Sequence, residues 1–504
     1  MKHFPRFLSR ACSFSIVFFL LSTLIPGATF AASGEQYRRV EAHERATDLA
    51  TAYFVAVPSQ LSLEDCLDLA VEHNRNVIIS KFRTKVAQEA GRQVSLSQRP
   101  SATLVVNETK LGEPSGSTGS SRQDVARLSL TENFAPFGKF HAQRLAARAT
   151  IAAAKAEERR SAIDTCFNVT KAFYDLMLAD EQIRVASESV SQLKKHRDHT
   201  DQLVQAGTAP RFDLLRAEVQ LSSARPALIK AQHLRATTLA DLLHLVGLDP
   251  ASEPKTVGSF PTSISGLPHS EDEAVILASK ERPDLEAAMA AEELSRRQIS
   301  VARQALQPTV QITGMTEQTR GSRNPLTIYK DNWSVMAGLV FPVFDSGISK
   351  SQTRQAQAVL VQSVVNTENV LSAMRVDIRK ALSGLAEAEE VLESQKKNVE
   401  QAEEALSIAQ AAYGTGAKTA LDVLDAELAL TQARTLWYQA LHDRAVAASQ
   451  LEHSLGILPL QFRQTAVPKD EGTSLQTVPK KEAISPKTAS KKDVTARKIS
   501  LKKK

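Results

Sequence analysis

The apolar positions of the chain first follow a helical pattern over residues 63–97. They recur every three or four residues there, which predicts an amphipathic helix. Ser62 and Asp65 at its start have the spacing of a capping box. A matching helical pattern covers 270–307, and a proline follows each of the two segments. The sequence therefore predicts one helix at the start of each half of the chain.

After each proline the pattern changes to strict alternation, which is typical of β-strands. Residues 101–132 and 309–343 each contain two alternating runs joined by a polar loop with glycines. Each run has about 9–11 residues, the length of a tilted transmembrane strand. Alternation alone fits a soluble hairpin equally well. The apolar face of each run, together with an export signal described below, favours two membrane-spanning hairpins.

The longest helical segments follow these hairpins. Residues 138–206 contain no proline and no glycine beyond the first, and 347–412 contain only Gly384 beyond the first. A continuous helix over either segment would be roughly 100 Å long, at about 1.5 Å per residue. A glycine turn and a second helix follow each one, over 210–246 and 418–455. Helices of this length need neighbours along their whole length, so we expect a long bundle or tube.

The two halves of the chain repeat each other at an offset of 209 residues. Gly207 begins G-T-A-P-R-F-D-L-L-R-A-E, and Gly416 begins G-A-K-T-A-L-D-V-L-D-A-E. Two further pairs of glycines have the same offset: Gly138 with Gly347, and Gly247 with Gly456. A repeat that keeps its register over turn signals indicates two copies of one structural unit. We expect two pseudo-symmetric repeats, over 61–250 and 251–460.

The ends of the chain differ from this repeated body. Residues 1–31 combine basic residues, an apolar run and small residues before the expected cleavage site, the pattern of a secretory signal peptide. Residues 32–60 show no clear periodicity and are assigned to an N-terminal arm. Residues 461–504 are rich in Lys, Ser, Thr and Pro, which predicts a disordered basic tail. The protein is therefore expected to be exported.

The formal net charge of +6 is concentrated at these two ends. Three cations lie in the signal peptide, and 466–504 carries eleven Lys and Arg against four Asp and Glu, so the body has a net charge of −4. The basic pI of about 9.0 therefore gives no reason to expect nucleic acid as a partner. No later stretch approaches the roughly 18 apolar residues of a membrane helix.

Two cysteines, Cys66 and Cys166, remain after the predicted cleavage. In an oxidising compartment they could form a disulfide, since antiparallel helices flanking the first hairpin would bring them to similar heights. The alternative is two small residues buried in a core.

Four membrane strands in one chain cannot close a barrel, because bacterial barrels begin at about eight strands. An open sheet edge in lipid leaves backbone groups unpaired, at a cost of several kcal/mol each. Two copies would give about eight strands, whose interior side chains fill, whereas three copies give about twelve and leave a lumen. The fold class predicted is thus an α+β membrane protein. It is a homotrimeric 12-stranded β-barrel, with four strands per chain, continued by a long α-helical barrel.

Three motifs carry a family resemblance: L-V-F-P-V-F-D-S-G at 339–347, A-Y-G-T-G-A-K-T-A-L-D-V-L-D-A-E at 412–427 and A-S-Q-L-E-H-S-L-G at 448–456. With them, the chain over about 61–457 resembles the outer membrane factor (TolC-type) efflux and secretion channels. It departs from the family where N-F-A-P-F-G replaces the usual strand end at 133–138, and where Arg75 stands in place of a frequent proline.

The resemblance implies a barrel in the outer membrane, in contact with its lipid, and a helical part in the periplasm. It implies a homotrimer that serves as the passive exit duct of a tripartite efflux or type I secretion system. The implied partners are a periplasmic adaptor (membrane fusion) protein and an inner-membrane transporter.

The resemblance also implies a gate at the two turns that contain Gly207 and Gly416. Asp422 and Asp425 match positions that form acidic rings at the entrance of similar channels, and their spacing places both on one helix face. Three copies of each around a narrow opening would favour cations and raise the carboxylate pKa values through like-charge proximity. The alternative is a solvated helix N-terminus, where aspartate is favoured by the helix dipole.

A latch is implied beside these rings. Asp213 is the first-half counterpart of Asp422, and Tyr413 and Lys418 match positions that bond such an aspartate when the tip is closed. Arginine is possible at the position of Lys418, and lysine cannot form its bidentate contact. We therefore expect a weaker latch.

No catalytic, cofactor-binding or metal-ligating constellation is visible. The histidines are dispersed, and the chain lacks G-x-S-x-G, HExxH and phosphate-loop motifs. We therefore expect neither an enzyme nor a cofactor. The rival interpretation is an exported coiled-coil scaffold of the cell envelope without a pore.

Overall fold

The computed structural model describes residues 58–111, 121–135, 138–261, 266–323, 326–415 and 417–459. The predicted signal peptide, nearly all of the N-terminal arm, the basic tail and Gly416 lie outside the described residues.

Each half of the chain contains the same succession of elements. The first half has β1 (Gln60–Leu61), α3 (Leu63–His73), α4 (Arg75–Leu96), β2 (Ser101–Leu111), β3 (Ser121–Phe134), α5 (Lys139–Gln205) and α6 (Arg211–Val246). The second has β4 (Lys255–Thr256), α7 (Glu271–Glu281), α8 (Pro283–Arg303), β5 (Thr309–Arg323), β6 (Leu326–Val340), α9 (Ile348–Gly414) and α10 (Ala420–Leu455).

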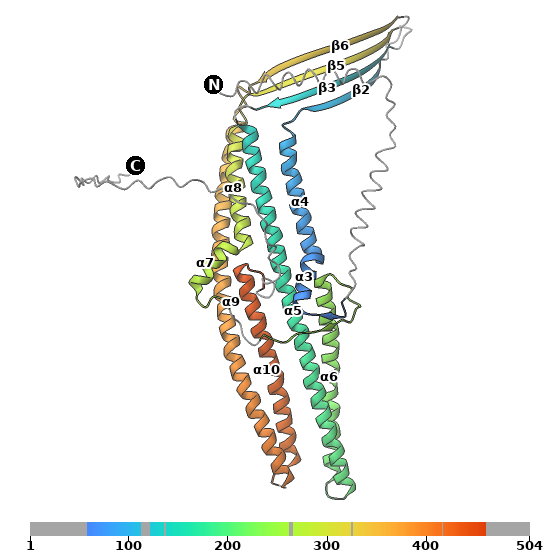
Figure 1. Ribbon diagram of the computed structural model, residues 1–504, viewed down its shortest axis with the longest axis vertical. Helices are drawn as coiled ribbons and strands as arrows, with labels where there is room; N and C mark the ends of the chain where they lie inside the picture. The colour runs from blue at the N-terminus through green and yellow to red at the C-terminus, as the bar shows by residue number, and fades with distance from the viewer. Residues whose placement is uncertain are drawn as a thin grey trace, which may run out of the picture.

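The long strands form one antiparallel sheet in the order β2-β3-β5-β6, at one end of the molecule (Figure 1). The central pair, β3 with β5, joins the two halves and aligns Leu130 with Gly314. β2 and β6 are the edges, each paired on one side only. Trp333, Val335 and Leu339 of β6 alternate along the strand and are all exposed. The sheet therefore has open edges and exposed apolar side chains.

The helices extend away from the sheet as two long hairpins (Figure 1). α5 and α9 have 67 residues each, and α6 and α10 have 36 each. Within each hairpin the two helices pack together, and α5 also packs against α8 and α10 of the other half. None of the described helices is both long enough and apolar enough to cross a membrane.

The prediction of a single helix at the start of each half is wrong, because the structure has two helices there in each half. Asn74 ends α3 and begins α4; its Oδ1 accepts from Asn76 N at 2.8 Å and its Nδ2 donates to Leu245 O at 2.7 Å. In the second half Arg282 separates α7 from α8, and Pro283 occupies the first turn of α8. A cap that bonds a distant backbone thus outweighs continuous helical periodicity.

The largest core lies where α3, α5, α6 and the end of α10 meet. Cys66 and Cys166 both belong to it, and both are free thiols rather than a disulfide. Burial, with a smaller contribution from a nearby aspartate in each case, raises the pKa of each thiol to about 12. The two cysteines therefore act as small buried side chains.

Candidate functional site at the hairpin tips

The residues of the predicted gate lie in two turns, or in the helix ends beside them, at the end of the molecule farthest from the sheet (Figure 1). One turn joins α5 to α6 and contains Gly207, and the other joins α9 to α10. The two hairpins are side by side, since α5 packs against α10. A single chain thus carries both turns at the same end.

The second turn is held by a capping box between Thr419 and Asp422. The Asp422 carboxylate accepts from Thr419 Oγ1 at 2.7 Å and from Thr419 N at 2.8 Å. These hydrogen bonds lower the pKa of Asp422, and the neighbouring Lys418 ammonium lowers it further. Within one chain the pKa therefore moves opposite to the rise expected for a ring of like charges, and Asp422 stays ionised.

The first turn reaches a similar shape by different means. Gly207 has φ of +77°, and a Cβ there would meet nothing within 4 Å, so the backbone conformation rather than space requires glycine. Pro210 begins α6 without any side-chain cap. Asp213 is bonded through its backbone N to Pro210 O at 3.1 Å. No hydrogen bond or ion pair of its carboxylate is found in the described part of the chain.

The predicted latch is not formed inside a single chain. Tyr413 packs against the small core of the α9–α10 hairpin, which is made of Leu406, Ala409, Val423 and Leu430. Lys418 is exposed. Across the described ranges, no hydrogen bond or ion pair joins Asp213 to Tyr413 or to Lys418.

Asp425 is exposed and lines a cavity of about 610 Å³ between α5, α6 and α10. Glu427, which sequence reasoning missed, lines the same cavity. Its Oε2 is buried without a hydrogen-bond partner among the described residues, and burial raises its pKa. The sequence repeat offers a signal for Glu427. Both turn motifs end in A-E, so Glu427 corresponds to Glu218 at the repeat offset.

Above the tips, a histidine bridges the two halves. His442 of α10 is 7% exposed; its Nε2 lies 2.7 Å from Asp175 Oδ1 of α5, and its Nδ1 lies 2.9 Å from Asp443 Oδ1. A protonated ring donates from both nitrogens and satisfies both contacts, whereas a neutral ring has a single N–H to donate. Burial by itself would lower the pKa of His442, but the hydrogen bonds to Asp175 and Asp443 outweigh it and raise that pKa.

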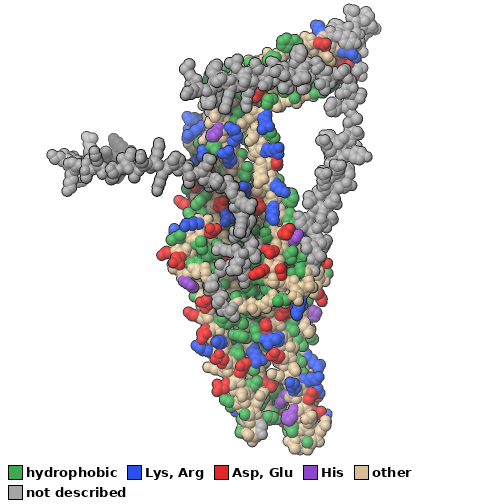
Figure 2. Space-filling view, in the orientation of Figure 1, with side chains coloured by type: hydrophobic (Ala, Val, Ile, Leu, Met, Phe, Trp, Pro, Cys, Tyr) green, Lys and Arg blue, Asp and Glu red, His purple; other side chains and the backbone are tan. Residues whose placement is uncertain are grey.

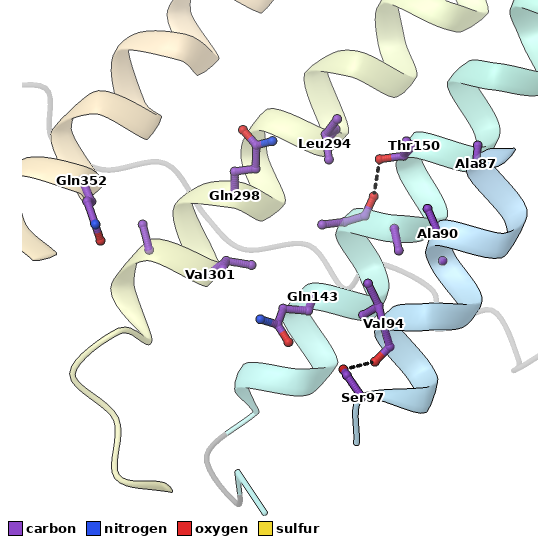
Figure 3. A pocket seen from close by; sticks show the side chains of 14 residues that line it. Ala87, Ala90, Val94, Ser97, Gln143, Thr150, Leu294, Gln298, Val301 and Gln352 are labelled. Atoms are coloured by element: carbon purple, nitrogen blue, oxygen red, sulfur yellow. Dashed lines mark hydrogen bonds between the residues drawn. The ribbon is translucent and has the colours of Figure 1, made fainter. Parts of the chain in front are cut away.

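A second cavity, of about 600 Å³, lies near the sheet between α4, α5, α8 and α9 (Figure 3). Its wall consists mainly of small and apolar side chains with three glutamines, Gln143, Gln298 and Gln352. The two hydroxyls that line it are bonded to helix carbonyls: Thr150 donates to Ala146 O and Ser97 to Val94 O. It contains no charged side chain that could act as an acid, base or metal ligand. Across the described ranges no cluster of three or more His, Cys, Asp or Glu could hold a metal ion.

Comparison with known proteins agrees with this architecture. The family profile described as "Outer membrane efflux protein" matches residues 66–248 and 275–457, one match in each half. The probable outer membrane lipoprotein SilC of Salmonella typhimurium is 24% identical, over 77% of this chain and 84% of its own length. The cation efflux system protein CusC of Escherichia coli K12 is 22% identical over the same shares.

Solved structures show the same fold. The outer membrane channel CmeC of Campylobacter jejuni superposes with a TM-score of 0.69 at 17% identity, over 78% of this chain and 85% of that one. A crystal structure of CusC gives a TM-score of 0.65 at 21% identity, over 78% and 92%. The paired matches of the family profile define the class as outer membrane efflux channels. The chain belongs to the outer membrane efflux protein family, as its motifs predicted.

Proposed function

We propose that three copies of the chain form the outer-membrane duct of a tripartite efflux or type I secretion system. The proposal rests on one observation: each half contacts the other half along one of its sides only, and its other side has no partner within the chain. β3 pairs with β5, and α5 packs against α8 and α10. The counterparts of these contacts one repeat further on would be β6 with β2, α9 with α4, and α9 with α6. None of them occurs to a comparable extent among the described elements.

A second copy would supply every missing contact at once. The free side of the second half of one chain would pack against the free side of the first half of the next. Such an association is head-to-tail and closes into a ring. The exposed apolar side chains agree with this, since Phe82 and Val86 of α4 are 47% and 71% exposed and Val361 of α9 is 65% exposed. These side chains lie on helices that each lack the partner expected from the repeat.

Three copies satisfy the barrel better than two. The sheet has four strands per chain, and about twelve strands leave a lumen whereas about eight are filled by side chains. The helices would continue that lumen into the periplasm. Residues 61–250 and 251–460 then act as two units of wall per chain, behind a signal peptide at 1–31 and ahead of a basic tail at 461–504.

The partners proposed are a periplasmic adaptor and an inner-membrane transporter. The relatives support this, since CusC is named as part of a cation efflux system and OpmQ of Pseudomonas putida as a pyoverdine export protein. Their cargoes differ in kind, so the feature they share is the duct. We infer that this chain takes its specificity from the transporter behind it.

The test is the assembly and conductance of the protein purified from outer membranes. The proposal expects an SDS-resistant, heat-sensitive trimer and discrete conductance steps in planar lipid bilayers. A soluble, elongated dimer without conductance would instead identify the envelope scaffold.

We also propose that the tips form the gate. In a trimer, Asp213 of one copy would face Tyr413 and Lys418 of the next, and its unbonded carboxylate is free to accept from both. Asp422 and Asp425 would ring the opening, with Gly207 and Gly416 as the turns. Asp213→Ala and Lys418→Ala are expected to raise the leak conductance. Unchanged conductance in both variants would contradict the latch, and an unchanged preference for cations in Asp422→Asn with Asp425→Asn would contradict the rings.

A further inference from the structure

Cations gather at the helix ends that adjoin the sheet. Figure 2 shows Lys and Arg side chains on the helices directly below the sheet, with few acidic side chains among them. In α5 the first carboxylate is Glu157, and in α9 it is Glu368. Ten cations lie within 14 residues of a strand at this end; Arg92, Arg296 and Arg297 are paired with glutamates of their own helices, and the other seven are not. We call this set the basic collar: Arg99, Lys139, Arg144, Arg148, Arg303, Lys350 and Arg354.

The collar is not neutralised within the chain. None of its seven side chains has a hydrogen bond or an ion pair in the part of the chain that the structure describes, and six of them are exposed, Lys139 being half-buried. Farther from the sheet some cations are paired, as Arg434 is with Glu188 and Glu403. The feature that distinguishes the sheet end is that α5 and α9 carry no carboxylate there.

The carboxylates near the collar have other partners or lie in the sheet. Asp345 accepts from Gly347 N at 3.0 Å and from Ser349 N at 2.7 Å. Glu132 belongs to β3. The acidic residues at this end of α4 and α8 pair with arginines outside the collar: Glu89 with Arg92, Glu292 with Arg296, and Glu293 with Arg297.

Exposed apolar side chains lie beside the collar at the junction of sheet and helices. Phe341, Val343 and Phe344 between β6 and α9 are 56%, 83% and 83% exposed, and Ile348 at the start of α9 is 59% exposed. Apolar groups next to a level of unpaired cations are the pattern of a surface at a lipid headgroup layer. A binding site for free phosphate ions would not explain the apolar groups.

We propose that the basic collar binds the phosphate groups of anionic phospholipids in the leaflet that faces the helices. The proposal rests on the membrane insertion of the sheet proposed above. The apolar junction side chains then lie against acyl chains, while the collar cations lie at the level of the headgroups. The collar fixes how deep the sheet sits, because a vertical shift would move unpaired cations into hydrocarbon or apolar side chains into water.

The experiment measures lipid retained by the full-length protein. Protein solubilised with an equal mixture of phosphatidylglycerol and phosphatidylcholine is purified, and each bound lipid is quantified by mass spectrometry. The wild type is expected to retain phosphatidylglycerol preferentially, by roughly fivefold for each cation that contacts a headgroup. The variant R144Q/R148Q/K350Q/R354Q is expected to retain the two lipids nearly equally.

A matched control removes four cations near the tips, in the variant K194Q/K195Q/R211Q/R216Q. This control variant should retain the wild-type preference for phosphatidylglycerol. A salt concentration of 0.5 M should reduce the preference in the wild type and in the control variant alike. Equal retention of both lipids by the wild type, or an unchanged preference in the collar variant, would overturn the proposal. Retention of no lipid at all would instead contradict the membrane insertion itself.

Discussion

The α5–α6 and α9–α10 hairpins have the same lengths but differ in their charge pairing. Arg434 of α10 bonds Glu188 of α5 at 3.0 Å and Glu403 of α9 at 2.9 Å. At the repeat offset its counterpart is Arg225, and lysines replace both glutamates: Lys194 corresponds to Glu403, and Lys397 to Glu188. The duplication has thus kept the shape of the hairpin while reversing charges around an arginine that both halves contain.

The same contrast holds for the histidines. His233 lies at the repeat position of His442, but Gly384 corresponds to Asp175 and Leu234 to Asp443. Contacts between the halves of one chain therefore contain ionic hydrogen bonds, whereas the equivalent contacts between copies in the proposed trimer lack these partners. The difference indicates that the joint inside a chain is the stronger one, and the predictions below test it.

The largest effect is expected where both halves need the same backbone. Gly247 and Gly456 have φ of +87° and +74°, and a Cβ would lie 2.7 Å from His73 O and 2.6 Å from Arg282 Cα, respectively. Gly→Ala at either site should cost more than about 3 kcal/mol, since strain and a backbone clash add. Gly207→Ala, with open space around its Cβ, should cost only about 1 kcal/mol. Thermal unfolding in detergent measures this, and equal losses at the three sites would contradict it.

The next effect concerns His442 and depends on pH. Its folded pKa is raised, so its contribution is fully present below the unfolded pKa of about 6.5 and is lost as pH rises through the folded pKa. At acidic pH, His442→Gln should cost on the order of 2 kcal/mol. At alkaline pH the cost should be smaller.

The matched control for this prediction is His233→Gln. His233 is exposed and has no carboxylate at the equivalent positions, so the variant should unfold like the wild type at every pH. Amide hydrogen exchange measures the same pH dependence locally, in residues 436–446 around His442 and in the equivalent residues 227–237 around His233. Asp175→Asn should give a pH response of the same sign, because it removes the acceptor of His442 Nε2, and a cost of His442→Gln that does not change with pH would refute the assignment.

A smaller effect is expected at the tips, where only the second turn has a capping box. Thr419→Ala should destabilise the start of α10 by about 1 kcal/mol, because it removes the hydroxyl bonded to Asp422. Pro210→Ala at the uncapped equivalent should have a smaller effect on α6. Hydrogen exchange at the first turns of the two helices gives the comparison, and equal losses would show that the capping box contributes little.

The smallest effect is expected at the arginine pair. Arg434→Gln should cost about 0.5–1 kcal/mol, since its bridges are partly exposed and screened by water. Arg225→Gln should be neutral or slightly stabilising, because it relieves like charges. If both substitutions cost the same, the charge reversal has no energetic consequence.

The sequence by itself determined the class of this protein. Alternation located both hairpins, unbroken periodicity located the long helices, and the offset of 209 residues revealed the duplication. These features depend on local spacing, which is readable along the chain because side-chain direction repeats every two or 3.6 residues. The capping box predicted at Ser62 and Asp65 is likewise present at the start of α3.

Only the tertiary structure decided which side chains have partners. The break at Asn74 depends on a bond to Leu245, 171 residues away, and the free thiols of Cys66 and Cys166 depend on how the core packs. The raised pKa of His442, which needs Asp175 of α5, and the lack of partners for the collar cations likewise depend on other elements. Periodicity specifies the face of its own helix or strand on which a residue lies. Whether that residue is buried or paired depends on the element that packs against this face.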